Sequence, residues 1–175
     1  MHSDSDNKLK EIVSRRIEFF KKKPEAAIYR PKVSSRHIRG LYTETEVREH
    51  TVKADYGEAA GGTNLAPNPI ELLLAAFAAC IESAFYEFAL HEGLSADSVS
   101  VDVEGSLDLR GLFMVDEDVP PGFSDIKYVI NIKTSEDRDK VQRLAEKVIA
   151  HCPVVDSLVR RISISGTINI NNQEG

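Results

Sequence analysis

Two cysteines are the residues of this chain best suited to chemistry. Cys80 is next to last in an uninterrupted apolar run, Leu72 to Ile81, and Cys152 directly precedes Pro153. Only the thiolate of a cysteine attacks a substrate or binds a metal. The helix dipole favours the thiolate at a helix N-terminus, which is the place of Cys152 if a helix begins at Pro153.

Cys80 needs help to react. Burial in the middle of an apolar helix raises the pKa of its thiol. A nearby cation would offset this, and arginine is the natural candidate because it always stays charged. On composition alone, two buried structural cysteines remain an alternative.

Other kinds of site have weaker support. The cysteines and His151 could contribute to a zinc site, but no Cys-x-x-Cys or similarly close spacing occurs. There is no nucleophile-elbow motif of a serine hydrolase, and the glycines of residues 57–62 do not open a helix as a phosphate-binding loop does. We therefore expect no metal and no cofactor.

Length and charge limit the class of protein. The chain has 175 residues, enough for one domain, and a net charge of -6, which argues against nucleic acid as a partner. It shows neither an apolar signal-peptide core nor an apolar run of the roughly 20 residues that cross a bilayer. We expect a cytoplasmic protein without membrane partners, in which a disulfide would be catalytic or redox-sensing.

The N-terminus, residues 1–24, is expected to be an appended amphipathic helix, and residues 25–175 the main domain. Apolar residues recur at helical spacing over residues 7–23, and Pro24 ends the pattern. The helix is also basic, and we expect it to dock on the body or on a partner subunit with its charges in water.

The main domain alternates strands and helices. A long helix is expected from Pro69 to about Glu92, because Asn68 can cap it, Glu71 completes a capping box and Gly93 can end it. The strands are expected at residues 28–38, 42–48, 50–55, 99–109, 126–133 and 162–170, and further helices at residues 134–151 and 153–160.

These elements predict an α+β fold with antiparallel sheets. The first half of the long helix is apolar on every side, so sheets must wrap it, with or without help from a second subunit.

Two segments resemble the family of osmotically inducible protein C and the organic hydroperoxide resistance protein (OsmC/Ohr). The first is the glycine- and proline-rich loop and apolar run of residues 61–80, which ends at Cys80, and the second is His151-Cys152-Pro153-Val154. The resemblance covers residues 30–170 and implies an intertwined homodimer whose sheets wrap central helices. It also implies reduction of organic hydroperoxides, with Cys80 as the peroxidatic cysteine and Cys152 as the resolving cysteine.

The resemblance further implies a disulfide intermediate that a dithiol of the lipoyl or thioredoxin type reduces. Two departures from the well-characterised peroxidases indicate a less characterised branch. Their acidic residue follows the proline directly, where Ile70 stands here, and Glu71 comes one residue later. Glu71 is therefore either catalytic or only a helix cap.

The active-site arginine is ambiguous. Arg39 resembles the turn arginine of the peroxidases, and Arg48 resembles an arginine before the third strand in the other branch. We expect Arg48, ahead of Arg39, to lie near Cys80. Two other functions remain open: a non-enzymatic small-molecule or lipid-binding protein, and a thiol redox sensor.

Overall fold

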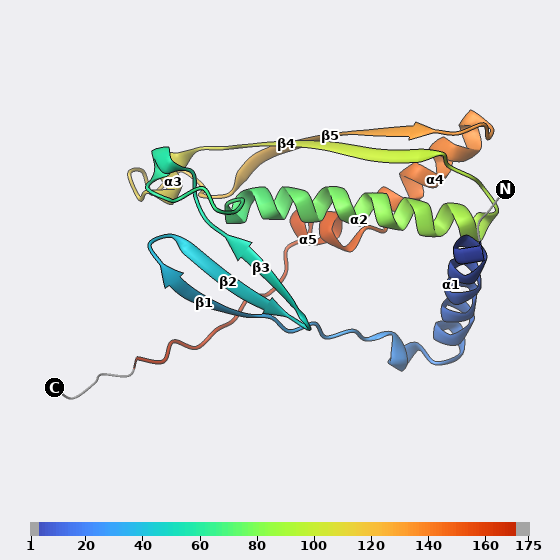
Figure 1. The fold of residues 1–175 in the computed structure, drawn as a ribbon, viewed down its shortest axis with the longest axis horizontal. Helices are drawn as coiled ribbons and strands as arrows, with labels where there is room; N and C mark the ends of the chain where they lie inside the picture. Colours follow the sequence, from blue (N-terminus) through green and yellow to red (C-terminus); the bar gives the residue numbers. More distant parts are fainter. Residues whose placement is uncertain (1–3, 171–175) are drawn as a thin grey trace.

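The structure, a computed structural model, describes residues 4–170 (Figure 1). It confirms the α+β class, with antiparallel sheets and one long helix near the centre. The helices are α1 (Asp4–Lys22), α2 (Pro69–Glu92), α3 (Leu109–Leu112), α4 (Arg138–Ala150) and α5 (Pro153–Val159), with 3-10 turns η1 (Pro24–Ala27) and η2 (Glu58–Ala60). The strands are β1 (Ser34–Arg39), β2 (Tyr42–Val47), β3 (His50–Ala54), β4 (Ser98–Leu107) and β5 (Phe123–Lys133).

Helix α2 begins and ends where its local signals predict. The Asn68 side chain accepts from the Glu71 N–H, the Glu71 carboxylate accepts from the Asn68 N–H, and Gly93 closes the helix with a φ of 77°. A glycine suits that position because a left-handed φ strains other residues. By length and composition α2 is also long and apolar enough to cross a membrane, a test that the core helix of a soluble protein passes too.

The β4–β5 hairpin covers one side of α2 (Figure 1). Its strands pair antiparallel from Ser98↔Lys133 to Leu107↔Phe123. Phe85 and Ala89 of α2 pack with Leu144 and Val148 of α4 in one buried cluster. The chain therefore encloses the C-terminal half of α2 between a sheet and a helix.

Helix α1 forms as expected and lies against the C-terminal end of α2 (Figure 1). Val13 is buried there, the Ser14 hydroxyl lies 3.0 Å from Nδ1 of His91, and the Tyr86 hydroxyl donates to Asp6 at 2.7 Å. These contacts fix α1 to the body, and its lysines and arginines stay exposed.

The β1–β2–β3 sheet stands apart from the rest of the chain (Figure 1). Every residue of β1 is exposed, and the sheet makes hardly any contact with the other helices and strands. Only Tyr42 of the sheet is a buried apolar residue. One chain by itself therefore leaves both faces of this sheet largely in solvent.

Three segments differ from the sequence prediction. Residues 28–33 form no strand, and β1 begins only at Ser34. Residues 162–170 form no strand and are exposed, because no strand of the described chain pairs with them. The predicted loop after the fourth strand starts with the short helix α3, capped by the side chain of Asp108.

Candidate active site

The two thiols meet, although they lie far apart in sequence. Sγ of Cys152 lies 3.0 Å from Sγ of Cys80, and both cysteines are free. A disulfide bond would require a separation of about 2.05 Å. The structure therefore brings the pair together in its reduced form.

Two elements position these sulfurs. Cys80 lies on α2 beside Ile81, which is fully buried, and about one turn after buried Phe77. Cys152 is the N-cap residue of α5, directly after α4, because Pro153 cannot continue α4 but suits the first position of a new helix. Phe77, Ile81 and Cys152 share one buried cluster with Val101 of β4.

The electrostatics of Cys80 disfavour its thiolate within one chain. Burial is the main cause that raises the pKa of Cys80, and the hydrogen bond with Cys152 raises it further. A hydrogen bond from the backbone N–H of Val154 acts in the opposite direction and favours the thiolate. The net effect is a raised pKa for Cys80, so reaction near neutral pH requires a positive charge from elsewhere.

The two cysteines differ in access. Cys152 is almost completely buried, at 1% exposure, whereas Cys80 is only partly buried. A small molecule from solvent therefore reaches Cys80 first.

An apolar groove of about 510 Å³ adjoins the thiol cluster. Phe77 and Val155 line the groove and also pack in or against the cluster around Cys152. Most of the groove's other lining residues are apolar too, among them Leu73, Phe123, Tyr128 and Leu158. Neither cysteine lines the groove itself, so the groove offers an alkyl or aryl group a place beside the cluster around Cys152.

Neither candidate arginine lies among the groups that shift the pKa of Cys80 in this chain. Arg39 ends β1 and its guanidinium lies over the ring of Tyr42, 5.6 Å from the ring centre. Arg48 sits in the tight turn between β2 and β3 with a left-handed φ of 55°. Both arginines thus lie on the sheet that stands apart from the body.

Glu71 belongs to the helix cap. Its carboxylate accepts from the backbone N–H of Asn68 at 2.7 Å. Glu71 precedes Cys80 by nine residues, and at about 100° per residue it faces the opposite side of α2. The structure does not bring Glu71 to the sulfurs.

Sequence reasoning missed Asp55, which organises the loop before α2. Asp55 is 1% exposed, and its carboxylate accepts from the N–H groups of Tyr56, Thr63 and Leu65 and from the Thr63 hydroxyl. The Thr63 hydroxyl is the main cause that lowers the pKa of Asp55 to about 2. An aspartate between a strand and a glycine-rich loop was the available signal, because aspartate often bonds nearby backbone in turns.

No three metal-ligating side chains gather anywhere in residues 4–170.

Comparison with known proteins agrees with this geometry. The family model of the OsmC-like protein matches residues 61–166, which include both cysteines. No curated protein sequence matches the chain. The structure resembles an OsmC-like protein from Mycoplasma pneumoniae, with a TM-score of 0.65 and 14% identity over 74% of this chain and 87% of that one.

Two further structures carry descriptive names. An organic hydroperoxide resistance protein OsmC from Legionella pneumophila has a TM-score of 0.55 and 23% identity, covering 76% of this chain and 91% of that one. The organic hydroperoxide resistance protein OhrB of Bacillus subtilis has a TM-score of 0.51 and 24% identity, covering 76% of this chain and 93% of that one. At such identities these likenesses concern the fold. Together with the family match, they establish that this chain belongs to the OsmC-like protein family.

Proposed function

We propose that this protein reduces organic hydroperoxides with Cys80 as the peroxidatic and Cys152 as the resolving cysteine. The single observation that carries the proposal is the 3.0 Å separation of the two sulfurs. A sulfenic acid formed on one sulfur lies within reach of the other thiol without rearrangement of the chain.

The reaction has three balanced steps. The Cys80 thiolate attacks the terminal oxygen of the hydroperoxide, so that an S–O bond forms and the O–O bond breaks; the leaving alkoxide takes up the proton that the Cys80 thiol released on ionisation and departs as the alcohol. The Cys152 thiol then attacks the Cys80 sulfenic acid, which forms the disulfide and releases water. A dithiol of the lipoyl or thioredoxin type finally reduces the disulfide and is itself oxidised.

The assignment of the two roles rests on access. Cys80 is partly exposed and Cys152 is buried, so the peroxide meets Cys80 first. The apolar groove beside the cluster favours substrates with an alkyl or aryl group over hydrogen peroxide. The expected substrates are therefore bulky organic hydroperoxides.

The missing positive charge is proposed to come from a second copy of the chain. Arg48 is the first candidate and Arg39 the second. Arg48 lies at a turn of the exposed β1–β3 sheet, where it is free to approach the Cys80 of another chain. An arginine within about 4–6 Å would lower the pKa of that thiol.

Two further exposed surfaces of the chain support an obligate homodimer. Ala75, Ala76, Ala79 and Ser83 form an exposed stripe of small residues along α2, and such stripes allow two helices to approach closely. The exposed isoleucines of residues 162–170 also lack a neighbour. We expect an interface above roughly 2,000 Å² and a mass in solution of about 39 kDa, twice that of the 19.4 kDa chain.

Two cysteine variants test the proposed reaction. Cys80→Ser should abolish consumption of cumene hydroperoxide in the presence of dithiothreitol. Cys152→Ser should complete one turnover and leave a Cys80 sulfenic acid that dimedone traps. Single-turnover activity in Cys80→Ser together with its loss in Cys152→Ser would reverse the two roles.

Two rival functions give different results with the wild-type protein. A small-molecule or lipid-binding protein, which the apolar groove also suits, would bind apolar ligands without consuming peroxide. A redox sensor would form the disulfide once but show no sustained turnover with a dithiol. Sustained peroxide consumption therefore separates the proposed enzyme from both.

A further inference from the structure

The segment that follows β4 and contains α3 carries an apolar surface that nothing in the described chain covers. We call residues 108–118 the α3 loop. Its apolar side chains are 46–88% exposed and belong to Leu109, Leu112, Phe113, Met114 and Val115. Soluble proteins rarely leave such a continuous group of apolar side chains in water without a partner.

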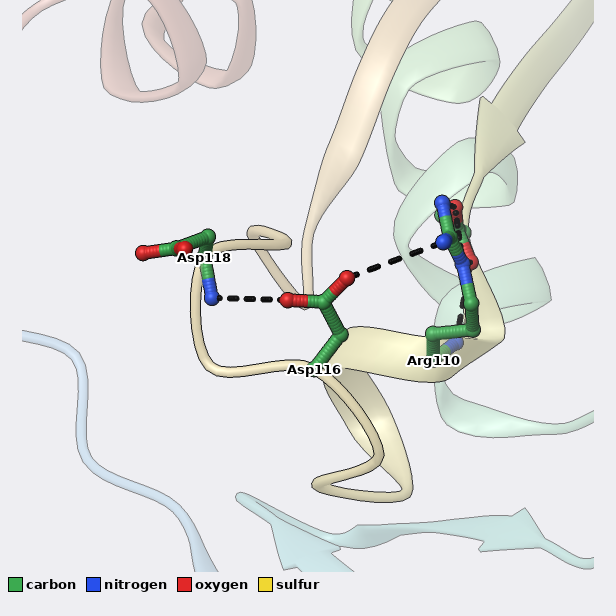
Figure 2. Close-up of polar contacts among 4 residues, drawn as sticks. Arg110, Asp116 and Asp118 are labelled. Carbon is green, nitrogen blue, oxygen red and sulfur yellow. Dashed lines mark hydrogen bonds and ion pairs between the residues drawn. The ribbon is translucent and has the colours of Figure 1, made fainter.

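Polar contacts hold the α3 loop in this shape (Figure 2). The Arg110 guanidinium pairs with Asp108 at 2.6 Å and lies 3.6 Å from Asp116, whose other oxygen accepts from the Asp118 N–H. The chain packs tightly at Gly111, where a Cβ atom would lie 2.4 Å from the carbonyl oxygen of Val119. The loop is therefore ordered from within by polar groups and presents its apolar groups outward.

A second uncovered surface is basic, whereas the α3 loop is acidic at its end. We call residues 28–33, which connect η1 to β1, the strap. Ile28, Tyr29 and Val33 of the strap are 56–79% exposed, and Arg30 and Lys32 lie between them. The α3 loop ends in acidic residues 116–118, so the two surfaces match in both apolar character and charge.

The two surfaces are well separated in one chain. Figure 1 shows α3 beside the N-terminal end of α2, near the β4–β5 hairpin, whereas the strap runs from η1 to β1 on the other side of α2, below its middle. They do not touch within the described chain, so a second copy is where the two can join, and a two-fold axis makes any such contact twice.

We propose that the α3 loop of one subunit docks on the strap of the other, twice per dimer. The inference rests on the homodimer proposed above and adds the surfaces that join at its periphery. It also gives α1 a role, because the contacts of Ser14 with His91 and of Tyr86 with Asp6 anchor the helix that leads into the strap. The strap lies outside residues 61–166, so the contact adds to the interface a segment that the family model does not match.

Cross-linking tests the contact directly. In a Cys80→Ser/Cys152→Ser background, the pair Met114→Cys and Tyr29→Cys should give a covalent dimer on mild oxidation with copper phenanthroline. Met114→Cys with Asp139→Cys is the matched control, because Asp139 is an exposed residue near the start of α4. Equal cross-linking of the two pairs, or no cross-linking of the first pair, would overturn the proposal.

Charge reversal provides a second readout that needs no new thiol. Glu117→Lys/Asp118→Lys and Arg30→Glu/Lys32→Glu should each speed subunit exchange between labelled dimers by about 10-fold. Mixing the two variants restores attractive pairs at both contacts, so the mixed dimers should exchange at a rate close to wild type. Additive effects without restoration would contradict the pairing of these surfaces.

The outcomes separate this inference from the function on which it rests. A wild-type chain that is a 19.4 kDa monomer in solution would refute the homodimer and the contact together. A dimer that consumes hydroperoxide but fails both tests would refute only the contact between loop and strap.

Discussion

Helix α2 is enclosed on one side by the β4–β5 hairpin and α4, whereas the β1–β3 sheet of the same chain is almost bare on both faces. The enclosed region needs no partner to bring Cys80 and Cys152 together. The bare sheet carries Arg39 and Arg48, the cations that could activate Cys80. The contrast assigns the pairing of the sulfurs to one chain and their activation to an assembly of two.

A large-to-small substitution in the enclosed region should have the largest effect on stability. Phe85 is 1% exposed, and Phe85→Ala should lower the free energy of unfolding by about 3–5 kcal/mol because it leaves a cavity beside α4. Urea denaturation followed by circular dichroism measures the change. Phe19→Ala on the exposed side of α1 is the matched control and should cost less than about 1 kcal/mol. Equal losses would contradict the assigned core.

A charge on the small-residue stripe should break the assembly but not the chain. Ala79 is exposed on α2, and arginine suits a helix nearly as well as alanine. Ala79→Arg should therefore weaken the dimer by about 100-fold or more, which light scattering across a dilution series would detect. Gln142→Arg on the outer face of α4 is the control. An unchanged dimer in Ala79→Arg would place the interface elsewhere.

Removal of the proposed cation should shift a pH profile. The pKa of Cys80 is raised by burial, so its thiolate disappears as the pH falls, and loss of a nearby arginine raises the pKa further. Arg48→Met should move the midpoint for alkylation of Cys80 by iodoacetamide up by about one pH unit in a Cys152→Ser background. Arg39→Met is the parallel test. If neither variant moves the midpoint, the activating charge does not come from this sheet.

A change in stability that depends on pH is expected at the loop before α2. The folded state holds Asp55 as a carboxylate with a pKa of about 2, below its ordinary value of 3.8. This stabilisation is present above the ordinary value and is lost as the pH falls through about 2. Asp55→Asn should therefore lower the Tm at neutral pH, and the difference from wild type should shrink towards pH 2. A pH-independent difference would exclude titration of Asp55 as the cause.

Local signals in the sequence predicted the elements that a chain builds by itself. Asn68, Pro69 and Gly93 fixed both ends of α2, because caps and terminators act through neighbouring backbone. The alternation of apolar and polar residues likewise located β4 and β5 to within a few residues. The same kind of pattern failed for residues 162–170, because alternation does not say which edge a strand pairs with.

The site was predictable only in part. The meeting of Cys80 and Cys152 followed from a resemblance and not from their spacing, because the distance between them depends on how α4 returns to α2. The contribution of the Val154 N–H could not be foreseen, since it arises from backbone geometry at the start of α5. The capping role of Glu71, by contrast, was already an open alternative in the sequence.

One thiol titration tests the redox pair of Cys80 and Cys152 most directly. Wild-type protein has two free thiols per chain, and addition of one equivalent of cumene hydroperoxide should remove both. Mass spectrometry of non-reduced peptides should then show Cys80 joined to Cys152 within one chain, with one equivalent of cumyl alcohol released. Loss of neither thiol, or a disulfide only between chains, would contradict the claim that one chain holds a complete pair of redox cysteines.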